Sequence, residues 1–101
     1  MKRVIYKYQI PAIPGRHKIK FATISDIVAV QPQGEFITLW ATVRPDLLGI
    51  KTVGEELTKT FQVVMTGEEF EEVENGVRFY LGTCQFHGGS WVLHVFRIIE
   101  P

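Results

Sequence analysis

A single thiol and a few imidazoles are the side chains of this sequence with the clearest capacity for chemistry. The 101 residues include one cysteine, Cys84, and three histidines, which are His17, His87 and His94. A thiolate beside an imidazole forms a nucleophile–base pair, and the same two groups are common ligands of zinc. Either role requires the fold to bring these side chains to one place, so the pairing of the strands that carry them decides the question.

The C-terminal segment, which carries most of these groups, predicts a β-hairpin. Residues 77–87 and 90–98 are rich in β-branched and aromatic side chains, and Gly88 and Gly89 separate them. A two-residue glycine loop favours a type I′ turn, because both central residues of that turn need positive φ angles. The turn sets the register of the whole hairpin. The expected pairs are His87–Ser90, Phe86–Trp91, Cys84–Leu93, Thr83–His94 and Leu81–Phe96.

In this register the reactive groups lie apart. Successive side chains of a strand point to opposite faces, so Cys84 and His94 lie on opposite faces of the hairpin. His87 and His94 share a face, but their separation of about 13 Å along the strand is too large for one metal ion. We therefore expect no metal site, no cofactor and no thiol–imidazole catalysis. The simplest role for His94 is a hydrogen bond to Thr83 or to the backbone.

Other catalytic motifs are absent from the sequence. There is no Gly-x-Ser-x-Gly elbow, phosphate-binding loop or dinucleotide fingerprint. Seven glutamates between residues 54 and 75 offer the residue type of a general acid and base, but such a density on a polar segment is typical of solvated surface. We therefore expect that the protein is not an enzyme.

The charges are balanced in total and separated along the chain. Eleven Lys and Arg residues offset eleven Asp and Glu residues, which disfavours nucleic-acid binding because phosphate contacts need a basic excess. Residues 1–20 carry six cationic side chains and no acid, whereas residues 54–75 carry seven glutamates and only Lys59 as a cation. Two interpretations stay open. The two regions form complementary solvated faces within the fold or between protomers, or the acidic region docks on a basic partner.

The elements that position these groups are strands, because the dominant apolar period is two rather than 3.6. The clearest alternation runs over residues 35–44, where every second side chain from Ile37 to Val43 is apolar. One helical turn or a polar loop is expected at 68–74, and a loop at 45–56. The expected strands cover residues 4–10, 17–23, 27–30, 35–44, 58–65, 77–87 and 90–98.

These strands predict an all-β, mainly antiparallel fold in a single domain over residues 1–101. About seven strands and at most one short helix fit either a small barrel or a two-sheet sandwich. Turns are expected at Pro32-Gln33-Gly34 and at Asn75-Gly76. Both faces of the C-terminal hairpin are apolar, so the hairpin is expected to be central and covered on both sides.

Large aromatic side chains are the best candidates for recognition. Trp40 lies on a strand face that also carries Thr38 and Thr42, and a mostly polar face with one tryptophan is a common place for a partner. The sequence leaves open whether the large aromatic residues build the core or contact a partner. These residues are Phe36, Trp40, Tyr80, Phe86 and Trp91. The candidate binding residues are Trp40, Phe86, His87, Gly88, Gly89, Trp91 and His94.

Cysteine usage and hydropathy predict the compartment. One cysteine cannot form an internal disulfide, and the N-terminal residues lack the apolar region of a signal peptide. No apolar run reaches the length of a membrane span. These features predict a protein of the reducing cytoplasm that does not bind membranes.

Motifs along almost the whole chain resemble a known family. They are Ile5-Tyr6-Lys7-Tyr8, Leu39-Trp40-Ala41-x-Val43-x-Pro45 and, above all, Tyr80-Leu81-Gly82-Thr83-x-Gln85-Phe86-His87-Gly88-Gly89-x-x-Val92-x-His94-Val95-Phe96. The chain resembles a family of small uncharacterised proteins encoded in bacteriophage and prophage genomes. The resemblance implies a phage-encoded protein of the bacterial cytoplasm, and it supplies no catalytic residue. Residues 45–56 look longer than in that family.

Together these inferences predict a non-catalytic binding protein that acts on a host or phage protein in the bacterial cytoplasm. One alternative is a virion or assembly component that forms a symmetric oligomer, because a homo-oligomer is also compatible with the sequence. Another alternative is a module that binds a small ligand or nucleotide near Trp40 or the glycine hairpin. Specific nucleic-acid binding is not expected.

Overall fold

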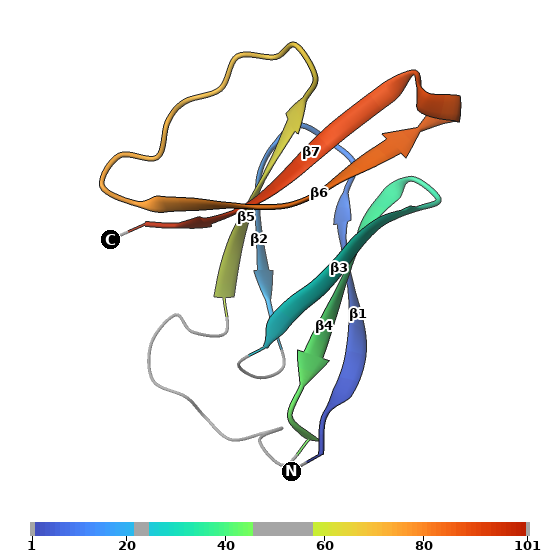
Figure 1. Cartoon of the computed structure of the whole chain (residues 1–101), viewed down its shortest axis with the longest axis vertical. Helices are drawn as coiled ribbons and strands as arrows, with labels where there is room; N and C mark the ends of the chain where they lie inside the picture. The colour runs from blue at the N-terminus through green and yellow to red at the C-terminus, as the bar shows by residue number, and fades with distance from the viewer. Residues whose placement is uncertain (1, 22–24, 46–57, 101) are drawn as a thin grey trace.

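The computed structural model describes residues 2–21, 25–45 and 58–100, and these residues form seven β-strands (Figure 1). The expected loop at 45–56 lies almost wholly outside the described residues. Three strands form one antiparallel sheet in the order β1-β4-β3, and four form a second in the order β2-β5-β7-β6. The strands are β1 (Val4–Pro11), β2 (Gly15–Lys20), β3 (Asp26–Gln33), β4 (Phe36–Val43), β5 (Thr58–Met65), β6 (Val77–Phe86) and β7 (Trp91–Ile99).

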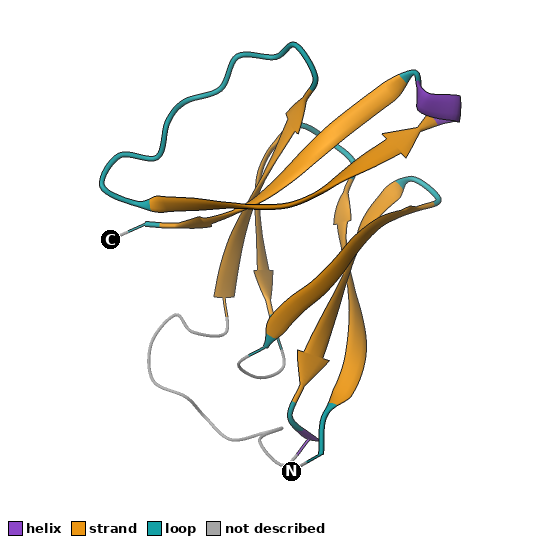
Figure 2. Ribbon diagram, in the orientation of Figure 1, coloured by secondary structure: helices purple, strands orange, loops and turns teal. Residues whose placement is uncertain are grey.

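The predicted all-β class is confirmed, and the two sheets do not close into a barrel (Figure 2). Of the two architectures expected from the sequence, the two-sheet arrangement is therefore the observed one. The connection after Pro11 carries the chain from the first sheet to the second, because β1 pairs with β4 and β2 pairs with β5. The edge strands β3 and β6 of the two sheets lie close to each other.

The core lies between the two sheets and follows the period of two. On β4, the side chains of Ile37, Leu39 and Ala41 are fully buried, as their alternation predicts. Phe61 on β5 faces them from the second sheet, and Phe21 fills the space after β2 with its ring 6.1 Å from that of Phe61. Burial of these apolar side chains is the main source of stability for a domain of this size.

A β-bulge in β6 corrects part of the expected hairpin register. The pairs Phe86–Trp91, Cys84–Leu93 and Thr83–His94 are confirmed. Beyond them the register shifts between Tyr80 and Gly82, so Tyr80 rather than Leu81 pairs with Phe96. The extra residue of a bulge reverses the facing of every side chain beyond it. Tyr80 therefore lies on the same face as Phe96, and their ring centroids are 5.6 Å apart.

The expectation that the hairpin is central and covered on both sides is wrong. β6 is an edge strand, and Tyr80 on its outer face is 60% exposed. A loop of residues 66–76, called the acidic loop below, crosses part of this face, and the ring of Phe70 lies 6.2 Å from that of Phe96. The loop contains no helix, so the polar-loop alternative for 68–74 is the observed one. Asn75 has a φ of 55°, which confirms the turn at Asn75-Gly76.

The turn between β3 and β4 begins later than expected. Gly34 and Glu35 form it, and Pro32 belongs to β3, where it pairs with Ile37. Proline has no N–H to donate, and β3 accommodates it because this strand lies at the edge of its sheet. The strands on either side of Gly34, β3 and β4, pair with each other as an antiparallel hairpin.

Gly82 marks the closest approach of the two edge strands. A Cβ at this position would lie 3.3 Å from Cβ of Val30 on β3. We expect Gly82→Val to lower the free energy of unfolding by about 1–3 kcal/mol, because the added methyl groups overpack this contact. Urea unfolding measures the effect. Adding Val30→Ala to Gly82→Val should restore part of the lost free energy of unfolding, because it removes the overpacked methyl groups. If the effects of the two substitutions on this free energy were simply additive, the contact between residues 30 and 82 would be contradicted.

Candidate functional site

The turn between β6 and β7 has a left-handed backbone. His87, Gly88 and Gly89 have φ angles of 52°, 69° and 91°, and the backbone N–H of Ser90 donates to the carbonyl of His87 at 3.4 Å. The positive φ angles expected for the two glycines are confirmed. His87 also adopts one, so it belongs to the turn, and the expected pair His87–Ser90 is replaced by Phe86–Trp91 as the last pair of the ladder.

A crevice of about 340 Å³ lies beside this turn, at the end of the molecule remote from the N-terminus. We call it the tip crevice. Three segments far apart in the sequence form it: the end of β1 with the connection that follows, the β3–β4 turn, and the hairpin tip. Its walls are Pro11, Ala12, Ile13, Glu35, Phe36, Phe86, His87 and Trp91.

Three rings form one wall of the tip crevice. The ring of Trp91 lies 6.1 Å from Phe86 and 6.0 Å from His87, with the imidazole nearly parallel to the indole. Phe86 is buried in the core and fixes this wall to the sheet. The indole N–H of Trp91 contacts the sulfur of Met65 at 2.9 Å, so the polar atom of the ring has a partner and the rest of the ring provides apolar surface.

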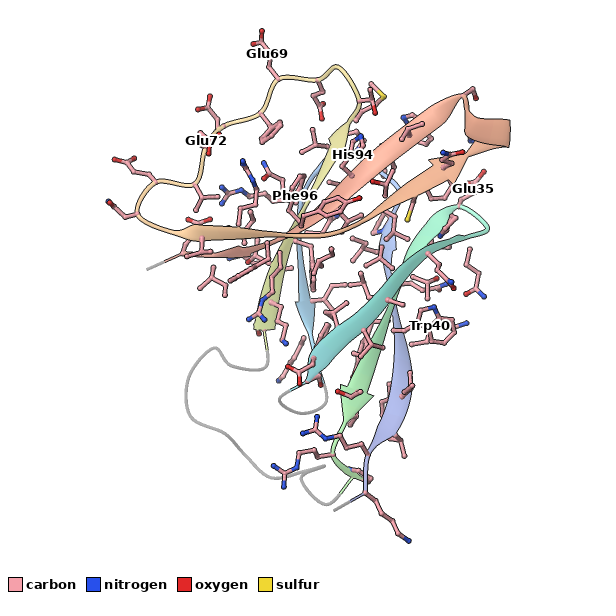
Figure 3. The ribbon with its side chains drawn as sticks, viewed as in Figure 1. Glu35, Trp40, Glu69, Glu72, His94 and Phe96 are labelled. Atoms are coloured by element: carbon pink, nitrogen blue, oxygen red, sulfur yellow. The ribbon has the colours of Figure 1, made fainter. Side chains whose placement is uncertain are left out.

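The opposite side of the crevice is apolar and exposed. Phe36 is 46% exposed and Ile13 is 57% exposed. Glu35, on the turn between β3 and β4, provides a carboxylate at the rim (Figure 3). An apolar recess of this size with one charged group at its edge is suited to receive an apolar side chain of a partner or a small apolar ligand.

Two of the expected site residues lie elsewhere. Trp40 is on the outer face of the three-stranded sheet, where its indole N–H donates to the side-chain carbonyl of Gln31 at 3.2 Å (Figure 3). Around it runs an amide network in which Gln33 accepts hydrogen bonds from Lys7 at 3.1 Å and Gln9 at 3.0 Å. This face carries a polar network, and the structure does not bring Trp40 together with the hairpin tip.

His94 links the acidic loop to the sheet. Its Nδ1 lies 3.1 Å from the hydroxyl of Thr83, and its Nε2 lies 2.7 Å from the hydroxyl of Thr66. The hydroxyl of Tyr80 extends this chain to Thr83 at 2.5 Å. The predicted hydrogen bond between His94 and Thr83 is thus confirmed. The bulge in β6 adds Tyr80 to the network. The register expected from the sequence, with Leu81 opposite Phe96, would place Tyr80 on the opposite face of the hairpin.

Cys84 is separated from this network by the sheet itself. Its side chain is fully buried in the core, and burial raises the pKa of the thiol because a thiolate would lose its hydration. A high pKa keeps the thiol protonated and weakly nucleophilic. Within the described residues, no group of three His, Cys, Asp or Glu side chains is placed to hold a metal ion.

Lys59 is a buried charge that the sequence did not reveal. The side chain is 5% exposed, its ammonium donates to the backbone carbonyl of Ser25, and it lies 5.1 Å from the ring centroid of Phe21. Burial and, to a smaller extent, the nearby Arg97 lower the pKa of Lys59, while Asp26 raises it. Lys59 lies two residues before Phe61 on β5, so its inward position follows from the same phase that buries Phe61 and Val63.

The sequence predicted the residues on the hairpin side of the tip crevice, and it did not predict those on the opposite side. Phe86, His87 and Trp91 line the hairpin side, and Gly88 and Gly89 form the turn that presents them. Ile13 was not considered, and Phe36 was weighed as a recognition aromatic but not included in the final set of candidate residues. The sequence indicates a turn at residues 11–15 and places Phe36 on the outer face of its strand. Neither feature indicates that these residues lie next to the hairpin tip.

Comparison with known proteins identifies one family. A family model described as a domain of unknown function (DUF7352) matches residues 1–101. No curated protein and no solved structure matches the chain. In the described part of the chain, no helix has the length and apolar character needed to cross a membrane.

The buried position of Cys84 has a measurable consequence. We expect its modification by a disulfide reagent at pH 8 to be at least about tenfold slower in the native protein than in urea-unfolded protein, because the raised pKa and the burial both suppress the thiolate. Absorbance of the released thiol follows the reaction. Equal rates of modification in the native and unfolded protein would contradict the buried position of Cys84. They would make a reactive thiol possible again.

The lowered pKa of Lys59 makes stability depend on pH. Between the folded pKa and the unfolded value near 10.4, the unfolded chain binds more protons, so the stability of the native protein rises with pH. Lys59→Met lacks this titration, as does Lys59→Arg, whose guanidinium stays charged. We expect the stability of the native protein relative to either variant, from urea unfolding, to increase between pH 8 and pH 10.5. A constant difference would contradict the shift.

Proposed function

The chain belongs to the family described as a domain of unknown function (DUF7352), and on that premise we propose that it is a non-catalytic protein-binding module that uses the tip crevice. The partner inserts an apolar side chain between the rings of the hairpin and the exposed side chains opposite them. The observation that carries this proposal is the exposure of Ile13 and Phe36 next to the half-buried Trp91.

Interfaces gain most of their affinity from a few large side chains that become fully desolvated in a pocket. Tryptophan is one of the residue types enriched at such positions. Trp91 already contacts the rings of Phe86 and His87 on the hairpin side. A partner side chain in the crevice would complete that environment. It would also remove Ile13 and Phe36 from water, and this burial of apolar surface drives association.

The chemistry of the tip crevice supports binding rather than catalysis. Phe86 is buried in the core and connects the aromatic wall to the sheet. Cys84 and His94, the two groups considered for thiol–imidazole chemistry, both lie outside the crevice. Cys84 is enclosed in the core, and the imidazole of His94 has hydroxyl partners at both nitrogens.

The resemblance to phage and prophage proteins suggests where the module acts. We place it in the bacterial cytoplasm, on a host or phage protein, without specific nucleic-acid or membrane contacts. A single thiol that is buried and unpaired fits a reducing compartment, where free cysteines persist. The balanced net charge gives the protein no general attraction to nucleic acid.

A small-ligand module is the second candidate, because the volume of the tip crevice, about 340 Å³, falls within the range of ligand pockets. The open, apolar walls favour a protein partner over a ligand, since the crevice offers few converging polar groups to orient a small polar molecule. A rise in melting temperature with a cellular metabolite that Ile13→Ser/Phe36→Ser abolishes would favour the ligand.

The double variant Ile13→Ser/Phe36→Ser tests the proposal without disturbing the core, because both side chains are exposed. We expect it to weaken capture of the partner from bacterial lysate at least tenfold, since truncating two contact residues costs about 1–2 kcal/mol or more. Quantitative mass spectrometry of the captured proteins measures the loss.

The matched control is Ile5→Ser/Val28→Ser, which removes two equally exposed apolar side chains outside the crevice. It should capture the same protein as the native chain. Capture that survives in the crevice variant, or that both variants lose equally, would refute the tip crevice as the contact site. Light scattering measures the oligomeric state of the native protein and of both variants. If the native protein is an oligomer and only the crevice variant is a monomer, the crevice binds a second copy of the chain.

A further inference from the structure

One carboxylate stands among the apolar walls of the tip crevice. Among the described residues that line the crevice, Glu35 is the single acidic one, and none is a lysine or an arginine. The others are three aromatic residues, one histidine and three aliphatic residues. The proposed function uses the apolar walls and gives this carboxylate no role.

The carboxylate of Glu35 has no partner in the described part of the chain. It forms no ion pair with His87, the other ionisable group of the crevice, or with any lysine or arginine that the structure describes. Lys7, on the outer face of the same sheet, donates instead to the side-chain carbonyl of Gln33 at 3.1 Å. Glu35 is exposed, so water solvates its charge in the free protein.

The backbone holds this carboxylate beside the apolar contact residues. The carbonyl of Glu35 accepts the backbone N–H of Ala12 at 3.4 Å, which joins the β3–β4 turn to the connection that supplies Ile13. Phe36, the next residue along the chain, begins β4. Figure 3 shows Glu35 at the β3–β4 turn, on the side of the hairpin tip. Glu35 is therefore next to both exposed apolar residues of the proposed contact.

A partner that covers the tip crevice removes water from Glu35. Ile13 and Phe36 lie beside it, so an interface that buries them covers the carboxylate as well. A carboxylate that loses its hydration without gaining a partner opposes binding. Glu35 therefore weakens a purely apolar contact, whereas a positive charge placed against it replaces the lost hydration.

The aromatic walls favour the same sign of charge. The face of an aromatic ring is partly negative, so it attracts a cation within about 6 Å of its centre, and tryptophan does so most strongly. Trp91 lines the hairpin side of the crevice, and Phe36 and Glu35 line the opposite side. Both sides of the crevice thus attract a cation and repel an anion.

We propose that the tip crevice selects a partner that carries a positive charge beside the inserted apolar side chain, and that Glu35 makes this selection. The inference rests on the proposed function, because it names the chemistry of the partner at that same site. An acidic residue at this position of a partner would meet Glu35 as a like charge. The carboxylate therefore also excludes partners whose apolar residue has an acidic neighbour.

Three six-carbon compounds with different terminal groups test the inference on the full-length ¹⁵N-labelled protein. Hexylammonium, 1-hexanol and hexanoate share an apolar chain and end in a positive, a neutral and a negative group. We expect them to shift the backbone amides of residues 35, 36 and 87–91. Hexylammonium should bind about two- to fivefold more tightly than 1-hexanol, the effect of one partly exposed ion pair, and hexanoate should bind more weakly than 1-hexanol.

Variants test whether the selectivity comes from Glu35. Glu35→Gln should bind 1-hexanol as the native protein does and lose the preference for hexylammonium, and Glu35→Lys should prefer hexanoate. Glu74→Gln and Glu74→Lys make the same charge changes on the acidic loop, outside the crevice, and should keep the native order of affinities. Both glutamates are exposed, so these substitutions leave the core unchanged.

Four results would overturn the inference. If none of the compounds shifts the amides of the crevice, or if hexylammonium and 1-hexanol bind equally well, the crevice does not select a cation. A preference for hexylammonium that persists in Glu35→Gln would assign the selection to the aromatic rings alone. A preference that Glu74→Gln reduces as much as Glu35→Gln would indicate a diffuse attraction to the acidic surface.

The inference and the proposed function fail separately. We expect Glu35→Lys to lower capture of the partner from lysate at least about threefold, because it turns an attraction into a repulsion, and Glu74→Lys to leave capture unchanged. If Ile13→Ser/Phe36→Ser loses the partner while Glu35→Lys captures it normally, only the inference is refuted. If that double variant captures the partner normally, the proposed function is refuted, and the order of the three compounds still decides whether Glu35 selects a cation.

Discussion

The pairing of Phe86 with Trp91 across the hairpin turn determines the positions on which the rest of this structure depends. It sets which side chains of β6 and β7 enter the core and which face outward. Cys84 and Leu93 go inward, and His94 goes outward to hold the acidic loop. The same pair forms the aromatic wall of the tip crevice. The left-handed turn fixes this pairing, because its glycines adopt positive φ angles at little cost.

The tip crevice derives from one architectural feature, the connection between β1 and β2. This connection carries the chain from one sheet to the other, and it therefore passes over the end of the core instead of folding back as a tight hairpin. Its first half faces the hairpin tip and its second half faces the acidic loop. The connection is short and is joined at its two ends to strands of different sheets.

The acidic loop combines a structural role with a surface role. Glu68 and Glu72 make contacts within the fold, the first with the backbone of Met65 and the second with Arg78. Their neighbours Glu69 and Glu71 remain without ion pairs among the described residues. Since the N-terminal twenty residues carry only cations, the molecule has a charge asymmetry that its zero net charge conceals. Such an asymmetry orients a charged partner during encounter and favours association on one side.

Local patterns were enough to predict the strands, the all-β class and the hairpin. The alternation from Ile37 to Val43 and the pair of glycines at 88 and 89 each act over a few residues, so the sequence alone determined which face of β4 is buried and why Cys84 cannot meet His94. The tertiary structure decided three other features. It placed the bulge that turns Tyr80 toward Phe96, left β6 at an edge, and brought Ile13 and Phe36 to the hairpin tip. Each of these three features depends on packing between segments that are far apart in the chain. The alternation within a single strand does not indicate which distant segments pack against it.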